Sequence, residues 1–194
     1  MKWSRPALEE AQVRREPQQS GALETSGGLG KYRFDDGHRA EFRAQFDLVR
    51  RDLVLSSLAA HVDPALSALT GVRGVYFVTM RLGGSEYKIY AGKTTSLPRR
   101  LTDYCKAFQV HSPNDFKLRA LQNYMWQRFP EAAFDLYFSK ESELGYTSDE
   151  TAAVRRHRPL INQRATKNVD AISIMQQACE THYAAVFGQK TGHA

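Results

Sequence analysis

The chain has few cysteines and no long hydrophobic segment. Its 194 residues include only two cysteines, Cys105 and Cys179, which are too few for a zinc cluster, and its six histidines show no metal-ligand spacing. No run approaches the roughly 20 apolar residues of a membrane span, and the first residues lack the apolar centre of a secretion signal. We therefore expect a cytoplasmic protein that does not associate with membranes. The length suits one domain with extensions.

Positive charge is concentrated in the second half of the chain. The net charge is +6. Residues 1–72 carry ten basic and ten acidic side chains, whereas residues 73–168 carry sixteen basic and nine acidic ones. Local patches, rather than total charge, attract a polyanion. The distribution therefore predicts that the segment 73–168 approaches a nucleic-acid backbone.

The N-terminal third is predicted to extend the core. Residues 1–33 are polar and glycine-rich, which is typical of a flexible arm. Residues 34–70 are predicted to be a helical extension, with one amphipathic helix over 35–62 and a short turn over 64–69. The apolar stripe of that helix consists of Phe42, Phe46, Val49, Leu53, Leu58 and Val62.

Residues 71–168 are predicted to form the core, and residues 169–194 a C-terminal helix. An apolar run around Tyr76, the turn residues Gly83-Gly84-Ser85 and a second run ending at Tyr90 predict a β-hairpin. A helix should begin after Ser96, a favourable N-cap.

Later patterns predict a second helix over 112–129, a third strand over 134–138 and a helix over 147–158. The resulting order is β-β-α-α-β-α. This order predicts an α+β fold with a small three-stranded antiparallel sheet flanked by helices.

Two motifs on the predicted hairpin resemble the signature of the GIY-YIG nuclease family. Gly74-Val75-Tyr76 is similar to its first half and Tyr90-Ala91-Gly92 to its second. Lys93, Arg100 and Tyr104 follow the second tyrosine at intervals of three, ten and fourteen residues. This spacing is similar to that of the incision nuclease of bacterial nucleotide-excision repair.

The later part of the core resembles the same family. Glu150 and Asn162, twelve residues apart, are similar to its metal-binding glutamate and terminal asparagine. The chain departs from the family at Ala91, which replaces an isoleucine, and in a longer hairpin that the Gly-Gly-Ser turn accommodates. Asp149 and Glu143 lie close to Glu150 in the sequence, so whether Asp149 shares metal binding is open at this point.

The resemblance implies a divalent-metal-dependent endonuclease that hydrolyses phosphodiester bonds of double-stranded DNA. The implied catalytic residues are Tyr76, Tyr90, Lys93, Arg100, Tyr104 and Glu150. The implied substrate-binding residues are Arg99, Lys106, Asn162 and Arg164. Glu150 would hold Mg²⁺, with Mn²⁺ as a substitute, because Mg²⁺ takes one or two carboxylates together with water and phosphate oxygens.

Tyr76 is the implied general base or water-positioning group, and Tyr90 and Tyr104 would orient phosphate or water. A free tyrosine has a pKa of about 10, so neighbouring cations must favour its phenolate if it acts as a base. Taken alone, Tyr76 and Tyr90 are better explained as ordinary strand residues, and Asn162 can be explained as a turn residue.

Several biological settings fit these residues. One is a restriction-type enzyme that forms a homodimer through its flanking helices, and another is a DNase of low sequence selectivity. A third is a toxin or effector nuclease that acts on foreign DNA and docks through residues 1–70. A catalytically silent nucleic-acid-binding module would have the same charge distribution.

Overall fold

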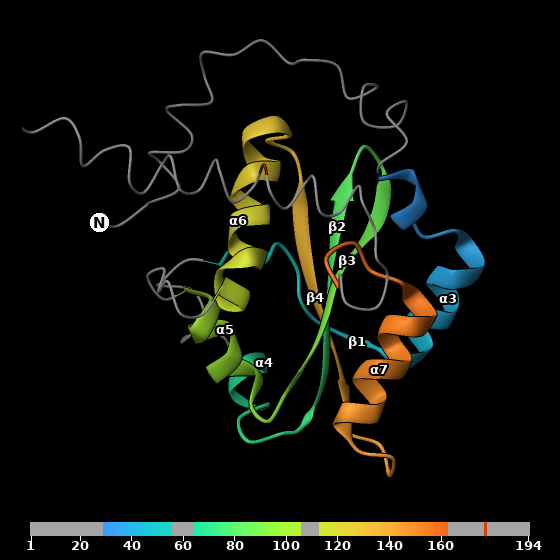
Figure 1. The fold of residues 1–194 in the computed structure, drawn as a ribbon, viewed down its shortest axis with the longest axis vertical. Coiled ribbons are helices and arrows are strands. Elements are labelled where there is room, and N and C mark those ends of the chain that lie inside the picture. Colours follow the sequence, from blue (N-terminus) through green and yellow to red (C-terminus); the bar gives the residue numbers. More distant parts are fainter. Residues whose placement is uncertain (1–28, 56–63, 106–112, 163–176, 178–194) are drawn as a thin grey trace, which may run out of the picture.

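The computed structural model describes residues 29–55, 64–105, 113–162 and 177. These residues form an α+β fold built on one antiparallel sheet with helices on both faces (Figure 1). The strands, in the spatial order β1-β4-β2-β3, are β1 (Asp47–Arg50), β4 (Ala133–Lys140), β2 (Gly74–Leu82) and β3 (Ser85–Thr94). The helical elements are η1 (Gly30–Tyr32), α3 (Asp36–Gln45), α4 (Pro64–Ser67), α5 (Leu97–Cys105), α6 (Pro113–Arg128) and α7 (Tyr146–His157).

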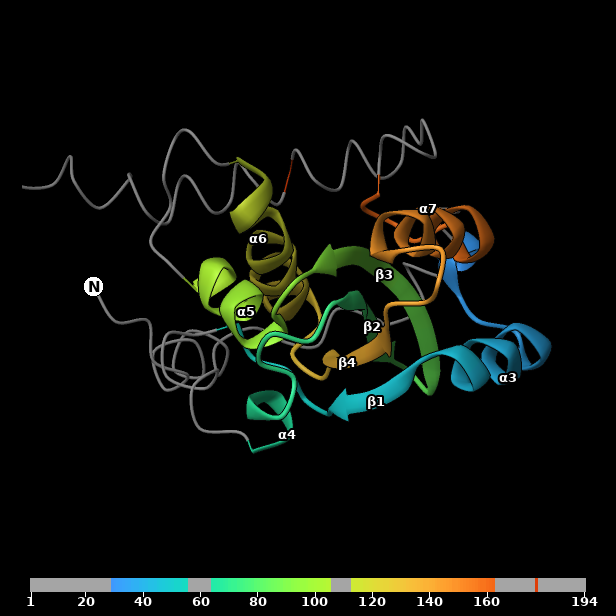
Figure 2. The same cartoon turned by 90° about the horizontal axis from the view of Figure 1, so that it is seen from below.

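Different helices bury the two faces of the sheet. Helices α5 and α6 cover one face, and α3 and α7 cover the other (Figures 1 and 2). Tyr76 and Met80 of β2 belong to the core under α5 and α6, whereas Val75 and Phe77 belong to the core under α3 and α7. This alternation is the two-residue period of a strand.

The predicted core elements are present between residues 74 and 157. Their order is β-β-α-α-β-α, as the sequence patterns predicted. The hairpin turns at Gly83 and Gly84, whose φ angles of 56° and 76° suit glycine. Ser85, predicted as part of the turn, already belongs to β3.

The predictions of a three-stranded sheet and of one helix over residues 35–62 are wrong. Helix α3 ends at Gln45, and β1 then pairs with β4, for example through Asp47 and Phe138. Phe46 follows the helix in an extended conformation and packs on Phe42, with 5.0 Å between the ring centroids. The free edge of β4 has backbone groups that need partners, and the spacing of apolar residues does not reveal that edge.

Several predicted elements lie partly outside the described residues. These are the arm up to residue 28, the end of the 35–62 helix from residue 56, and nearly all of the C-terminal helix. The last residues of the predicted arm are described, and Leu29 and Tyr32 are buried against the core. In the part of the chain that the structure describes, no helix is long and apolar enough to cross a membrane.

Candidate active site

A β-bulge in β3 determines which way the second hairpin tyrosine faces. The register of the hairpin shifts between Val78 and Thr79 of β2, which leaves Ile89 of β3 as an extra residue. Tyr90 therefore lies on the same face as Tyr76, in the core under α5 and α6. Regular alternation without the extra residue would place these two tyrosines on opposite faces.

Three tyrosines and one arginine are in contact at one end of this face. The hydroxyl oxygens of Tyr76 and Tyr104 lie 2.5 Å apart, and Nε of Arg100 donates to the Tyr76 hydroxyl at 3.4 Å. The guanidinium carbon of Arg100 lies 4.8 Å from the ring centroid of Tyr104. The ring centroids of Tyr76 and Tyr90 are 5.9 Å apart. We call these four residues the tyrosine cluster.

The glycines of the two motifs have a steric role in the hairpin. A Cβ on Gly92 would overlap the ring and hydroxyl of Tyr76, and a Cβ on Gly74 would overlap the carbonyl oxygen of Ser139 and the ring of Phe138. Any larger residue at either position would displace a strand or the Tyr76 ring. Gly92 therefore leaves room for the Tyr76 ring, and Gly74 allows β4 to lie close to β2.

The tyrosine cluster is buried beneath Arg100. Tyr76 and Tyr104 are 1% and 0% exposed, whereas Arg100 is partly exposed. Burial, followed by the charge that Tyr90 would carry, raises the pKa of Tyr76 well above its usual range, and Arg100 opposes this shift only in part. Burial also raises the pKa of Tyr104. Both hydroxyls are therefore neutral at neutral pH. Arg100 is the member of the tyrosine cluster that reaches the surface.

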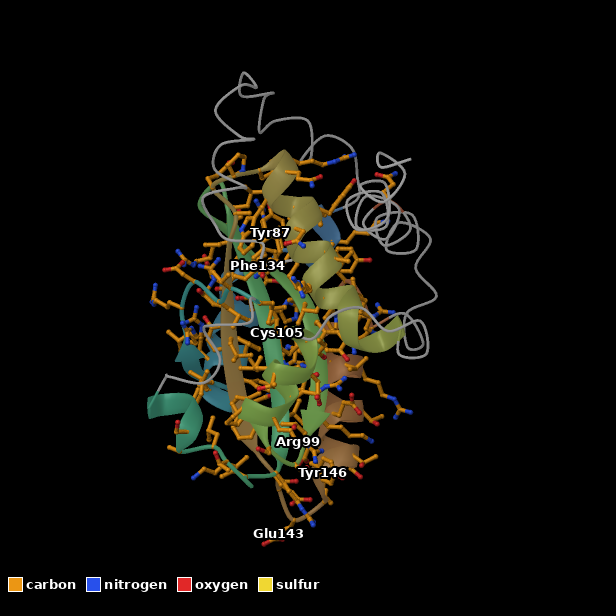
Figure 3. All side chains as sticks on the ribbon, turned by 90° about the vertical axis from the view of Figure 1, so that its left-hand side faces the viewer. Tyr87, Arg99, Cys105, Phe134, Glu143 and Tyr146 are labelled. Carbon is orange, nitrogen blue, oxygen red and sulfur yellow. The ribbon has the colours of Figure 1, made fainter. Side chains whose placement is uncertain are left out.

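Lys93 and Glu150 form a second group at the same end of the sheet. Nζ of Lys93 lies 3.6 Å from a carboxylate oxygen of Glu150 and donates to Oγ1 of Thr147 at 3.1 Å. The same Nζ lies 5.8 Å from the ring centroid of Tyr146. Figure 3 shows Tyr146 and Arg99 near this end of the molecule.

The two groups approach the end of β3 from opposite faces. Lys93 directly follows Gly92, so its side chain points toward α7, whereas the tyrosine cluster lies toward α5. Because β3 is an edge strand, both groups border the same strand end, where α5 and α7 also begin (Figure 1). Within residues 29–55, 64–105 and 113–162, no hydrogen bond or ion pair joins Glu150 to the tyrosine cluster.

Glu150 is the carboxylate of this region that is best able to accept a metal ion. Both oxygens of Asp149 accept hydrogen bonds from Ser142, at 2.8 Å from its backbone nitrogen and 2.5 Å from its hydroxyl. Glu141 accepts a hydrogen bond from the backbone nitrogen of Tyr146. Among the described residues, no three His, Cys, Asp or Glu side chains form a metal-binding group. The donor set therefore fits Mg²⁺, which binds to one carboxylate when water and phosphate oxygens complete its shell.

Asn162 holds the outer edge of β3. Its Oδ1 accepts a hydrogen bond from the backbone nitrogen of Ala91 at 2.9 Å, and its Nδ2 donates to the Ala91 carbonyl at 2.7 Å. The two preceding residues donate backbone hydrogen bonds to the carbonyls of Lys88 and Ile89. Asn162 thus continues the pairing with its side chain and positions Ala91 within the second motif. The contact with phosphate that the resemblance implies stays a prediction.

The remaining predicted residues are less closely tied to the site. Arg99 is exposed on α5, one residue before Arg100, while Lys106 and Arg164 lie outside the described residues. Sequence reasoning missed Lys117, whose Nζ lies 4.9 Å from the ring centroid of Tyr90. Packing of α6 against β3 creates this contact, and no motif marks it. Sequence reasoning also missed the contacts that Tyr146 and Thr147 make with Lys93.

No family model, no curated protein and no solved structure matches this chain.

Proposed function

We propose that the protein is a divalent-metal-dependent DNA endonuclease of the GIY-YIG type. The observation that carries the proposal is the contact among Tyr76, Tyr90, Tyr104 and Arg100 beside the paired Lys93 and Glu150. This contact brings positive charge and hydroxyl groups to one end of the sheet, and a phosphodiester substrate requires both kinds of group.

Arg100 and Lys93 are suited to the charge that develops during phosphodiester hydrolysis. Attack on phosphorus places additional negative charge on the nonbridging oxygens. Arg100 would contact one of these oxygens, because it is the partly exposed member of the otherwise buried tyrosine cluster. Lys93 would supply a second positive charge from the α7 side. A divalent cation held by Glu150 would supply Lewis-acid stabilisation of the leaving oxygen.

The burial of Tyr76 favours a positioning role over proton abstraction. Its raised pKa disfavours the phenolate at neutral pH, and its hydroxyl already contacts Arg100 and Tyr104. Tyr76 would therefore fix the guanidinium group, and through it the phosphate, rather than accept a proton. The ring of Tyr104 supports the same guanidinium from its other side.

A plasmid nicking assay tests the proposal. We expect the purified chain to nick supercoiled plasmid DNA in Mg²⁺ or Mn²⁺ and to stop when EDTA is added. Glu150→Gln keeps the size of the side chain, removes its charge, and should abolish nicking without abolishing DNA binding. Normal nicking by Glu150→Gln in Mg²⁺ would show that the metal is bound elsewhere.

A second candidate is a nucleic-acid-binding module without catalysis. The closed tyrosine cluster favours this alternative, because neither buried hydroxyl is open to an attacking water. A wild-type chain that binds DNA but produces no nicks in either metal would support it.

If nicks do form, sequencing the ends produced from a random DNA pool distinguishes the possible kinds of nuclease. Fixed ends indicate a restriction-type enzyme, and scattered ends indicate a nuclease of low selectivity.

A further inference from the structure

A lysine on α6 lies over one ring of the tyrosine cluster. Nζ of Lys117 lies 4.9 Å from the ring centroid of Tyr90, and Tyr90 is itself 8% exposed. Lys117 is partly exposed, so its ammonium group reaches the surface from above the ring. Neither the motifs nor their spacing includes this residue.

The charge of Lys117 has no acidic partner within the described ranges of the chain. Two other cations of the sheet have carboxylate partners: Lys93 pairs with Glu150 at 3.6 Å, and Arg81 with Asp135 at 2.8 Å. Among the described residues, the contact of Lys117 is with the Tyr90 ring. An aromatic ring holds a cation in place without neutralising its charge. No carboxylate of residues 29–55, 64–105 or 117–162 therefore competes with an external anion for Lys117.

Lys117 and Arg100 lie at the two ends of a continuous row of three aromatic rings. The ring centroids of Tyr76 lie 5.9 Å from Tyr90 and 6.3 Å from Tyr104. Lys117 covers the first end of the row and Arg100 covers the second. Helices α5 and α6, which carry these cations, lie side by side on the same face of the sheet (Figure 1).

We infer that Lys117 is a substrate-binding residue that contacts a second phosphate of the DNA, next to the phosphate that Arg100 meets. The inference rests on the proposed endonuclease function. Lysine binds phosphate as a point charge and needs no fixed geometry, which suits a contact that holds the backbone without reading its sequence.

Matched variants on α6 test this inference. Lys117→Met keeps most of the aliphatic stem over Tyr90 and removes only the charge, and Lys117→Arg restores it. Arg128→Met is the control, because Arg128 lies over the ring of Tyr124 at 4.4 Å on the same helix, about 16 Å away at 1.5 Å per residue. Each change is made in the full chain with Glu150→Gln, so that binding to a fluorescent DNA duplex is measured without cleavage.

We expect Lys117→Met to weaken DNA binding roughly fivefold at physiological salt and to reduce the slope of log affinity against log salt by about 1. Lys117→Arg should bind like the parent, and so should Arg128→Met. Unchanged affinity and slope in Lys117→Met, or an equal loss in Arg128→Met, would overturn the inference. If the parent chain neither binds nor, with Glu150 intact, cuts DNA, the proposed function itself fails, and this outcome is distinct from the others.

Discussion

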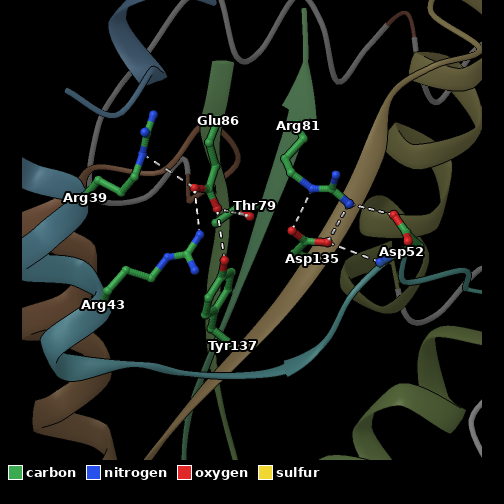
Figure 4. Close-up of polar contacts among 8 residues, drawn as sticks. All are labelled: Arg39, Arg43, Asp52, Thr79, Arg81, Glu86, Asp135 and Tyr137. Atoms are coloured by element: carbon green, nitrogen blue, oxygen red, sulfur yellow. Dashed lines mark hydrogen bonds and ion pairs between the residues drawn. The ribbon is translucent and has the colours of Figure 1, made fainter. Parts of the chain in front are cut away.

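Two buried polar clusters lie on opposite faces of the hairpin, and they differ in how their charge is balanced. On the face under α3, the carboxylate of Glu86 accepts hydrogen bonds from Thr79 at 2.8 Å, Tyr137 at 3.2 Å and Arg43 at 3.0 Å (Figure 4). Arg39 lies within 3.8 Å of the same carboxylate. Each donor in this group is directed at one anion that the chain itself supplies.

The tyrosine cluster on the other face contains no carboxylate. Its two buried hydroxyls share a hydrogen bond, and its cations, Arg100 and Lys117, lie over tyrosine rings. Burial of polar groups therefore does not by itself mark a functional site. Among the described residues Lys117 has no carboxylate partner, so the face that carries it is the better candidate for binding an external anion.

The largest expected effect is on nicking, and it distinguishes Arg100 of the tyrosine cluster from Arg43 beside Glu86. Arg100→Met should reduce plasmid nicking by about 10² to 10³, since it removes a donor to the developing charge, and should lower the free energy of unfolding by no more than about 1 kcal/mol, because its bond to Tyr76 is long and the side chain is partly exposed. Arg43→Met should do the reverse. It leaves Glu86 with fewer partners, and because Arg43 is 39% exposed we expect a loss of only about 1–2 kcal/mol. Nicking rates and urea unfolding are measured for both variants. Loss of nicking by Arg43→Met at a temperature where it is folded would contradict a purely structural role for the Glu86 cluster.

The face under α3 and α7 should also be the acid-sensitive one. His157 is buried against the rings of Phe42, Phe46 and Phe77, and burial lowers its pKa from about 6.5 to about 4, with Glu41 opposing the shift. Between these pH values, His157 is therefore protonated in the unfolded chain and neutral in the folded chain. The free energy of unfolding should fall as pH drops from about 6.5 to about 4, by at most about 3 kcal/mol.

Urea unfolding at pH 7, 5 and 4 measures this dependence, and His157→Phe is the matched control. Phenylalanine keeps an aromatic ring in the pocket and cannot be protonated. The variant should therefore lose the part of the pH dependence that belongs to this site. An identical pH dependence in wild type and variant would show that other groups cause it.

The two tyrosines that donate or share hydrogen bonds should also behave differently. Tyr76→Phe keeps the ring against Gly92 but removes the contact with Arg100, so nicking should fall by up to about a hundredfold through misplacement of the guanidinium group. Tyr137→Phe removes one donor to Glu86 and should lower the free energy of unfolding by about 1 kcal/mol without changing nicking. Full nicking activity in Tyr76→Phe would show that the Tyr76 hydroxyl does not position Arg100.

Local patterns predicted the elements of the core, but not how they come together. The hairpin, its glycine turn and the helices of residues 97–157 follow from turn chemistry and apolar periodicity, which are local properties. The strand β1 was missed because Phe46 and Val49 continue the helical spacing of Phe42, while the free edge of β4, far away in sequence, determines the pairing.

The same distinction applies to the candidate site. Motif spacing predicted that Tyr76, Tyr90, Arg100 and Tyr104 would lie together, and the bulge at Ile89 is what makes this arrangement possible. No pattern in the sequence predicted the bulge, because one extra residue in a strand changes neither its composition nor its length noticeably. The burial of the hydroxyls, which changes the role proposed for Tyr76, also depends on packing.

Asn162 lies at the strand edge between the two faces and gives the smallest expected effect. Its amide makes two hydrogen bonds to the backbone of Ala91, so Asn162→Ala should lower the free energy of unfolding by about 1 kcal/mol. If Asn162 only holds the edge of β3, the affinity for DNA measured with Glu150→Gln present should stay the same once the protein is folded. A loss of affinity with unchanged stability would instead assign Asn162 to the phosphate, as the motif resemblance implies. The binding surface would then extend around the edge of β3 and would not be confined to the face under α5 and α6.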